Sequence, residues 1–288
     1  MNNLSYIKNL KRGDLVKNIL LGVTIIFFGF FSLFPFAWMF ITSIRPGGEL
    51  YQVGKNPFGI KAVTLEHYQA LLAQTQFLQW MWNSFLIAFV ASIIALVIGV
   101  IAAYSLGRLR YKGGAFAALI VFTTYLIPPV LLFIPLNDVV NRLNLSNTLW
   151  SLILVYLTFL VPFIAWMLSG YFKSIPSELA DAARIDGASR IQAMIRIDLP
   201  LVLPGVVSIF FFAFTLSWNE YLYAFTFIRS SSKMPVALGV VNALQVGDVF
   251  FWGQLMAAAI LGSVPVVLVY TFLMDFYLAG LTAGAVKG

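Results

Sequence analysis

Six long apolar runs dominate the chain and restrict the folds that it can adopt. They lie near residues 19–41, 83–105, 115–136, 149–171, 201–223 and 254–277. About 20 apolar residues in a helix cross the hydrocarbon core of a bilayer. Because backbone groups in lipid must be hydrogen-bonded within their own segment, each run is expected to be helical. The sequence predicts an all-α membrane bundle of six transmembrane helices, with kinks at Pro128, Pro129 and Pro162.

Composition supports this class and excludes several others. Hydrophobic residues make up 61% of the 288 residues and charged residues 10%, which is outside the range of soluble domains. The chain has no cysteine, so it offers neither a disulfide framework nor a thiolate metal site. The formal net charge is +7, but the basic residues are scattered beside apolar runs and form no stripe with interleaved aromatics. Nucleic acid is therefore not an expected partner, whereas membrane lipid is.

The distribution of Lys and Arg predicts the direction of the helices, since cytoplasmic loops carry an excess of both. One side of the predicted bundle holds twelve of the 18 basic residues, namely Lys8, Lys11, Arg12, Lys17, Arg108, Arg110, Lys112, Lys173, Arg184, Arg190, Arg196 and Lys287. The other side holds Arg45, Lys55, Lys61, Arg142, Arg229 and Lys233. This bias predicts that both termini and the charged segment after residue 172 lie in the cytoplasm.

An external segment is expected at residues 43–80, with one short surface helix. Its apolar face would consist of Leu65, Tyr68, Leu72 and Leu78. The lone His67 is interpreted as a solvated residue, because no second metal ligand lies near it in the sequence.

One charged, Ala-rich stretch, ELADAARIDGASRIQAMIRIDLP from Glu178 to Pro200, separates two of the apolar runs. Acidic residues near its start favour a helix from Ser177 to Asp186, and Gly187 offers a left-handed stop. Ala180, Ala183 and Gly187 would form a smooth face that another surface can approach closely. A second short helix is expected, with an apolar face of Ala188, Ile191, Met194 and Ile195. On physical grounds alone, a helix pair that only lies on the membrane explains this segment equally well.

The order of residues in this stretch resembles the EAA motif of ABC importer membrane subunits, in which Glu-Ala-Ala, Gly and Ile-x-Leu-Pro recur at fixed separations. The matching residues are Asp181, Ala182, Ala183, Gly187, Ile197, Leu199 and Pro200. Asp181 replaces the Glu of the motif, which keeps the carboxylate but shortens its reach. The resemblance implies a coupling helix that docks on a separate cytoplasmic ATPase subunit, with contacts from Glu178, Asp181, Ala182, Ala183, Arg184, Asp186 and Gly187.

The resemblance covers the chain from about residue 82 onward and is strongest to carbohydrate-importing members, such as the smaller membrane subunit of the maltose importer. It rests also on Asn83–Gly113, on SWNEYLYAF at Ser217–Phe225 and on the tail GLTAGAVKG. In such subunits the tail reaches the ATPase, which here implies roles for Gly284 and Lys287. Two parts are expected: residues 1–81, with the first transmembrane helix, and a permease core at 82–288 that contains the coupling loop at about 172–200.

The implied function is that of a membrane-spanning permease subunit of an ATP-driven importer in a bacterial or archaeal inner membrane. It would import a carbohydrate, an oligosaccharide in particular, delivered by an extracytoplasmic solute-binding protein. The implied partners are a second permease subunit, in a heterodimer, and two ATPase subunits. The phosphate-binding pattern G-x-x-x-x-G-K-[ST] is missing. The chain is therefore expected to be no enzyme and to bind no cofactor or metal, with ATP and Mg²⁺ bound by the partner.

Several alternatives remain open at this level. A stand-alone secondary transporter or a membrane-embedded enzyme could also be this hydrophobic, although no internal repeat and too few carboxylates are present. Asn219 and Glu220 lie among aromatic residues. This position is equally consistent with a solvated acid in a belt of aromatic residues at the membrane surface and with the opening of a transport pathway. Asp275 is expected to pair with basic inner loops. The sugar, its length and its acidity are not specified by the sequence.

Overall fold

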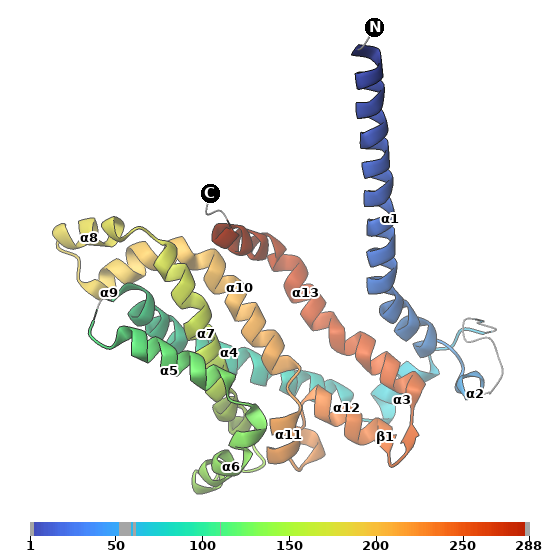
Figure 1. Cartoon of the computed structure of the whole chain (residues 1–288). Helices are drawn as coiled ribbons and strands as arrows, with labels where there is room; N and C mark the ends of the chain where they lie inside the picture. Colours follow the sequence, from blue (N-terminus) through green and yellow to red (C-terminus); the bar gives the residue numbers. More distant parts are fainter. Residues whose placement is uncertain (1–2, 52–58, 60–61, 110, 286–288) are drawn as a thin grey trace. The chain divides into compact units, whose positions relative to one another are not determined.

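The computed structural model describes the backbone of residues 3–51, 59, 62–109 and 111–285, and the side chains of those between residues 17 and 271. Its elements, in chain order, are α1 (Asn3–Ser43), α2 (Gly47–Leu50), α3 (Glu66–Gln74), α4 (Phe77–Arg108), α5 (Gly114–Leu126), η1 (Pro129–Leu132), α6 (Phe133–Arg142), α7 (Leu149–Ser174), α8 (Ser177–Ile185), α9 (Arg190–Ala193), η2 (Met194–Asp198), α10 (Leu199–Trp218), α11 (Leu222–Phe227), η3 (Ser231–Lys233), α12 (Val236–Leu244), β1 (Gln245–Val246), β2 (Val249–Phe250) and α13 (Trp252–Ala285). The all-α prediction is confirmed (Figure 1).

Five of the described helices are long and apolar enough to cross a membrane: Lys17–Ser43, Phe77–Arg108, Leu149–Ser174, Arg190–Trp218 and Trp252–Thr271. They match five of the six predicted spans. The fifth of the six predicted spans ends at Trp218 rather than near residue 223, so Glu220 lies outside the helix.

The third predicted span, 115–136, is not one straight helix. The helices Gly114–Leu126 and Pro129–Arg142 meet at an angle of 94°. Ile127 and Pro128 both precede a proline, and their ψ angles are extended, at 122° and 127°. The ring of a proline disfavours the α conformation in the residue before it, so two prolines in succession break the helix rather than kink it. Pro162 instead lies inside α7, which continues through it.

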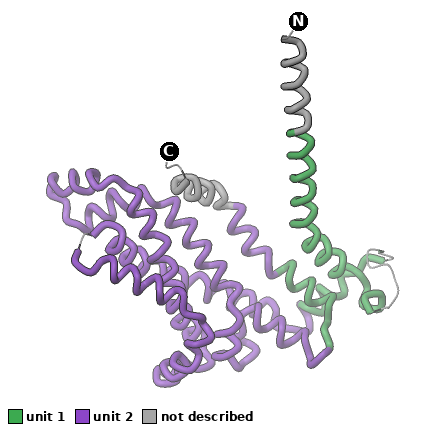
Figure 2. The backbone as a smooth tube through the Cα atoms, viewed as in Figure 1, with its two compact units in different colours: residues 1–71, 249–261 green, residues 72–248, 262–288 purple. Residues whose placement is uncertain are grey.

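The chain forms two compact units (Figure 2): residues 1–71 with 249–261, and residues 72–248 with 262–288. These units describe packing, and the functional boundary near residue 81 stays a prediction. In the first unit His67 is buried, which corrects its interpretation as a solvated residue. Its Nε2 lies 2.9 Å from the Arg45 carbonyl, and a Cβ on Gly253 would lie 2.2 Å from the same nitrogen. His67 is thus a packed core residue of α3.

The second unit is built on the contact between α4 and α7. Small residues recur every fourth position along α4, which places them on one face of the helix. They are Ala91, Ala95, Gly99, Ala103 and Gly107. A Cβ on Gly99 would lie 2.5 Å from Ile164, and one on Gly107 would lie 2.9 Å from the Ser169 carbonyl. Small side chains let two helix backbones approach closely, so this stripe fixes how α4 packs on α7.

Hydrogen bonds from the start of α4 hold the segment that leads into α12. Trp80 donates its ring N–H to the Ser231 carbonyl at 2.8 Å, and the Asn83 side chain donates to the carbonyls of Ser232 and Met234, both at 2.9 Å. These bonds satisfy carbonyl groups of the short helix η3 and of Met234, in the connection between α10 and α12. Such a connection is tolerated at membrane depth only when its polar groups have partners.

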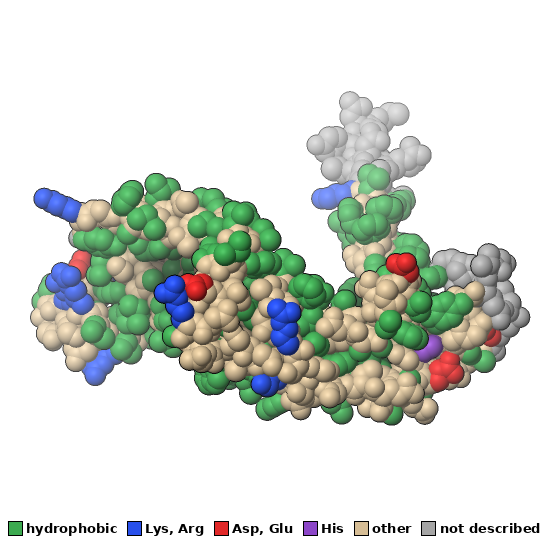
Figure 3. Space-filling view, turned by 90° about the horizontal axis from the view of Figure 1, so that it is seen from below, with side chains coloured by type: hydrophobic (Ala, Val, Ile, Leu, Met, Phe, Trp, Pro, Cys, Tyr) green, Lys and Arg blue, Asp and Glu red, His purple; other side chains and the backbone are tan. Residues whose placement is uncertain are grey.

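Hydrophobic side chains cover much of the visible surface in Figure 3, and the cationic side chains stand singly or in small groups. The apolar window of α1 has 0% of its residues buried within the described chain, whereas that of α7 has 56% buried. Exposed apolar area of this extent is stable only against lipid or another subunit.

The contact of α12 with α4 predicts a stability difference between two glycine substitutions. A Cβ on Gly239 would lie 2.2 Å from the Trp80 ring, whereas one on Gly170, in α7, would meet nothing within 4 Å. Gly239→Ala should lower the free energy of unfolding by about 1–2 kcal/mol, because a rigid ring must move. Gly170→Ala should leave it unchanged or raise it by up to about 1 kcal/mol. Thermal unfolding in detergent measures both, and equal shifts would contradict the described packing.

Candidate functional site

The loop between α7 and α10 begins with a helix whose ends are set by local sequence. α8 begins at Ser177, directly after Pro176, and ends at Ile185. Proline is tolerated there because the first N–H groups of a helix have no partner inside the helix. Gly187 has φ +90°, a left-handed conformation that glycine adopts without steric cost.

Two backbone hydrogen bonds close the end of α8. The Gly187 N–H donates to the Arg184 carbonyl at 3.1 Å, and the Ala188 N–H donates to the Ala183 carbonyl at 3.0 Å. Together they form a Schellman motif, the usual way in which a glycine ends a helix. The predicted helix and its stop at Gly187 are confirmed.

Most residues predicted to contact the ATPase are exposed on this loop: Glu178, Asp181, Ala182, Arg184, Asp186 and Gly187. Ala183 is half-buried. Asp181 and Arg184 lie one turn apart, and the Arg184 guanidinium donates to the Asp181 carboxylate at 3.5 Å. An exposed pair of this kind contributes little to stability, so both groups remain available to a partner.

Two apolar side chains that this loop exposes were not predicted from the sequence: Leu179 and Ile185 are 45% and 87% exposed. They could have been noticed as apolar residues within an otherwise charged segment. Ile191, predicted to lie on the apolar face of the second short helix, is 67% exposed. Ala180, by contrast, is half-buried and lines a cavity of the bundle, so the expected smooth face that includes it points partly inward. The outward surface of α8 is formed by Leu179, Ala182 and Ile185 instead.

The second short helix of the loop is not separate from the next span, which corrects the prediction. α9 begins with a capping box in which Ser189 and Gln192 bond each other's backbone N–H groups. The chain then passes through the π-turn Met194–Asp198 directly into α10. There the Leu199 N–H donates to the Met194 carbonyl, one residue farther back than in an α-helix. Pro200 has no N–H and crowds the carbonyl four residues before it, which explains the wider turn.

Arg108, the last residue of α4, forms a buried ion pair beneath this loop. Its guanidinium lies 2.6 Å from Oδ1 of Asp198, and the two side chains are 9% and 0% exposed. It also donates to the carbonyls of Ile175 and Pro176, at 2.8 and 3.2 Å. The sequence analysis used Arg108 only as a basic loop residue and gave Asp198 no structural role. No local pattern reveals a pair whose partners are 90 positions apart.

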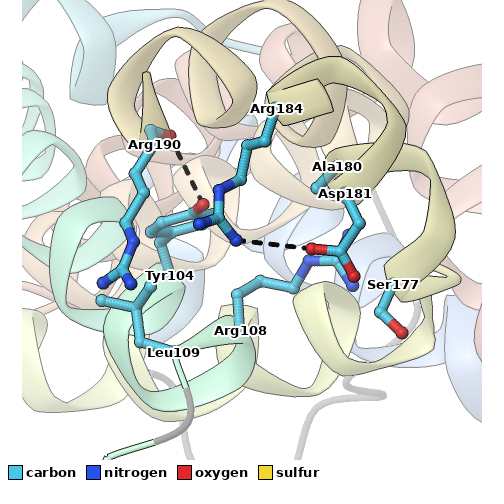
Figure 4. Close-up of a pocket in the computed structure, with 8 residues that line it drawn as sticks. All are labelled: Tyr104, Arg108, Leu109, Ser177, Ala180, Asp181, Arg184 and Arg190. Atoms are coloured by element: carbon cyan, nitrogen blue, oxygen red, sulfur yellow. Dashed lines mark hydrogen bonds and ion pairs between the residues drawn. The ribbon is translucent and has the colours of Figure 1, made fainter. Parts of the chain in front are cut away.

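A cavity of about 280 Å³ lies between α8 and the end of α4 (Figure 4). It is lined by Tyr104, Arg108, Leu109, Ser177, Ala180, Asp181, Arg184 and Arg190. The Tyr104 hydroxyl donates to the Arg190 carbonyl at 3.4 Å across it. The cavity separates α8 from the bundle on one side, so α8 stands out from the end of the unit rather than packing flat against it.

Glu220, at the opposite end of the second unit, serves the protein's own backbone. Its Oε1 accepts the Tyr223 N–H at 2.7 Å, and its Oε2 accepts the Ala224 N–H at 3.1 Å and the Tyr156 hydroxyl at 2.8 Å. Burial raises the pKa of Glu220, against hydrogen bonds that lower it. These contacts make Glu220 the cap of α11, which favours its structural interpretation over a pathway role.

The neighbouring polar residues have similar local roles. The exposed Asn219 donates its side-chain amide to the Thr215 carbonyl at 2.9 Å. The ammonium group of Lys233 donates to the Asn147 carbonyl at 2.8 Å. Asn147 has φ +57° and accepts the N–H groups of Arg229 and Ser230, both at 3.0 Å. These bonds stabilise the non-helical chain at this end of the bundle.

Three predicted residues of the C-terminal part cannot be compared with their predicted roles. Lys287 lies outside the described residues, and Asp275 and Gly284 lie in the part of α13 for which only the backbone is described. Among the side chains that the structure describes, no group of three or more His, Asp and Glu residues could hold a metal ion.

Comparison with known proteins decides the family. Residues 95–282 match the family of the binding-protein-dependent transport system inner membrane component. The chain belongs to this family. Its members are multi-pass inner-membrane permease subunits that work with a substrate-binding protein and separate ATPase subunits, so they are transport subunits and not enzymes.

Curated relatives extend the likeness to most of this permease. It is 35% identical to the inner membrane ABC transporter permease protein YcjP of Escherichia coli, over 89% of the chain and 92% of that protein. It is 30% identical to the trehalose/maltose transport system permease protein MalG of Thermococcus litoralis, over 96% of the chain and 99% of that protein. A third relative, the sulfoquinovosyl glycerol permease SmoH of Agrobacterium fabrum, is 34% identical over 89% of the chain and 90% of its own length.

Solved structures share the fold of the permease. A chain of a bacterial ABC transporter that imports the acidic polysaccharide alginate matches with a TM-score of 0.78, at 21% identity, over 92% of this chain and 98% of that chain. A chain of the methionine transporter MetNI matches with a TM-score of 0.58, at 19% identity, over 71% of this chain and 95% of that chain. At these identities the likeness supports the fold and says nothing of the cargo.

The capping role of Glu220 predicts the effect of removing one hydroxyl. Tyr156→Phe should lower the free energy of unfolding by about 1–3 kcal/mol, because the half-buried Glu220 carboxylate loses a hydrogen-bond donor. Tyr125→Phe is the control, since Tyr125 is 41% exposed. Thermal unfolding of the detergent-solubilised protein compares the two, and an unchanged midpoint for Tyr156→Phe would argue against the hydrogen bond from Tyr156 to Glu220.

Proposed function

We propose that this permease imports an oligosaccharide delivered by an extracytoplasmic solute-binding protein. The observation that carries the proposal is likeness to permeases named for glycosides, over nearly the whole chain. Besides MalG and SmoH, these include the diacetylchitobiose permease DasC of Streptomyces coelicolor, 31% identical over 89% of the chain, and the galactooligosaccharide permease GanQ of Bacillus subtilis, 31% identical over 89% of the chain. Their named cargoes all contain a glycosidic bond, which supports an oligosaccharide rather than an amino acid or an ion.

The loop that contains α8 is the proposed docking point for the ATPase. Its contact residues are Glu178, Asp181, Ala182, Ala183, Arg184, Asp186 and Gly187, to which the structure adds Leu179 and Ile185 because of their exposure. Two features support this role: the C-terminal end of α8 is closed by a Schellman motif, and α8 lies at one end of the second unit while α6, α11 and α12 lie at the other (Figure 1). A rigid, exposed helix with an apolar centre and charged rim is suited to a cleft in a partner.

A second permease subunit, in a heterodimer, is the proposed partner within the membrane. The unburied apolar surface of α1 supports this, because part of it can be covered by another subunit rather than by lipid. Two ATPase subunits complete the complex, and ATP with Mg²⁺ belongs to them, while this chain binds no cofactor. The C-terminal tail with Gly284 and Lys287 is proposed to reach the ATPase. Both termini lie in the cytoplasm in this arrangement.

Reconstitution tests the function. Vesicles that contain this permease, its second permease and its ATPase should take up labelled oligosaccharide only when ATP is inside and the binding protein is outside. Omitting either component should abolish uptake. Sugar uptake by the purified chain alone would instead support a stand-alone transporter.

Cross-linking tests the docking point, because the chain has no native cysteine. In the assembled complex, Ala182→Cys should form an adduct with the ATPase through a short cysteine-to-lysine cross-linker. Ser146→Cys, an exposed position after α6, is the matched control and should form none. Equal adducts at both positions, or none at Ala182→Cys, would refute docking through α8.

A further inference from the structure

The beginning and the end of the coupling loop are held by one side chain. The carbonyls of Ile175 and Pro176 directly precede α8, and both accept hydrogen bonds from Arg108, at 2.8 and 3.2 Å. Asp198 directly precedes α10, and its Oδ1 accepts from Nε and Nη2 of the same arginine, at 3.1 and 2.6 Å. Arg108 thus joins α4 to both chain segments through which the loop at 177–197 connects to the bundle.

The fork of the arginine is essential to this arrangement. A guanidinium has donors on three nitrogens in a rigid plane, so it can bind a carboxylate and two carbonyls at once, which the single ammonium of lysine cannot reproduce. The pair is also buried, with the two side chains 9% and 0% exposed, so water does not compete for it. A buried charge that loses its partner is strongly unfavourable, so the contact should persist while the surrounding helices move.

Two features of the contact would allow it to adjust when the helices move. The two hydrogen bonds from Arg108 to Asp198 end on the same carboxylate oxygen, Oδ1. The second carboxylate oxygen, Oδ2, is buried without a hydrogen-bond partner in the described part of the chain. Asp198 also ends the π-turn at Met194–Asp198, a wide turn of the kind that is frequent at functional sites and at helix kinks. If this turn changes its pitch, the Asp198 carboxylate can rotate and accept the hydrogen bonds of Arg108 with Oδ2 instead of Oδ1. The ion pair is then kept while the turn moves.

We propose that the Arg108–Asp198 pair is the pivot of the coupling loop. When a partner displaces α8, the loop moves as one lever about Arg108, and the motion passes to α4 and α10 together instead of bending the loop. Arg108 and Asp198 are positioning residues that touch neither cargo nor nucleotide. The inference rests on the proposed docking of α8 on the ATPase.

The pivot is tested in the complete reconstituted complex with two types of variant. Arg108→Leu combined with Asp198→Leu removes both charges, a change that buried ion pairs often tolerate without loss of stability. Arg108→Lys keeps the charge but loses the fork. Asp138→Asn is the matched control, because Asp138 pairs with Arg142 at 2.8 Å on the exposed surface of α6, with side chains 61% and 78% exposed.

Three quantities are measured for each complex: assembly by gel filtration, ATP hydrolysis stimulated by the binding protein, and oligosaccharide imported per ATP hydrolysed. The double variant and Arg108→Lys should assemble and hydrolyse ATP. The amount of oligosaccharide that they import per ATP should be at least about fivefold lower than that of the unmodified complex. The control should match the unmodified complex. If the Arg108–Asp198 pair only stabilised the fold, the variants would assemble less well, and the amount of oligosaccharide imported per ATP hydrolysed would not change.

The outcomes separate the pivot from the function on which it rests. Normal import per ATP in the assembled double variant would overturn the pivot while leaving the importer in place. Loss of assembly in both variants would likewise overturn it, since the pair would then act in folding alone. Absence of ATP-dependent import by the unmodified complex would instead defeat the proposed function.

Discussion

Close contact between α4 and α7 is the constraint on which the second unit depends. Gly99 and Gly107 leave no room for a side chain against α7, so the two backbones meet along a stripe of small residues. In lipid, association between helices comes from such packing rather than from the hydrophobic effect. The stripe ends at Gly107, and the next residue is Arg108. The packing of α4 on α7 therefore places the Arg108 guanidinium at the end of α7, where the coupling loop begins.

The same pair of helices organises the opposite end of the unit. Trp80 and Asn83, near the start of α4, satisfy the carbonyls that lead into α12, and Tyr156 of α7 donates to Glu220, which caps α11. Polar side chains at both ends of a tightly packed helix pair thus hold the segments between spans. At these connections the backbone leaves its helices, so its polar groups need partners from side chains.

Sequence reasoning succeeded where the physical cause is local. Runs of about 20 apolar residues identify a membrane span regardless of what packs against it. A glycine after a charged helix predicts the stop at Gly187, because only its own backbone is involved. It failed where local patterns were ambiguous: two successive prolines broke the third span at 94° instead of kinking it, and Ala180 of the expected smooth face was turned toward the bundle.

By itself, the sequence determined the all-α membrane class, the positions of most spans, the helix at residues 177–185 and, through its motif, the family. Only the tertiary structure decided that His67 is buried, that Glu220 caps a helix, and that Arg108 and Asp198 meet. The physical reason is the same in each case. The role of a polar side chain depends on which distant segments exclude water around it, and that is settled by the packing of helices far apart in the chain.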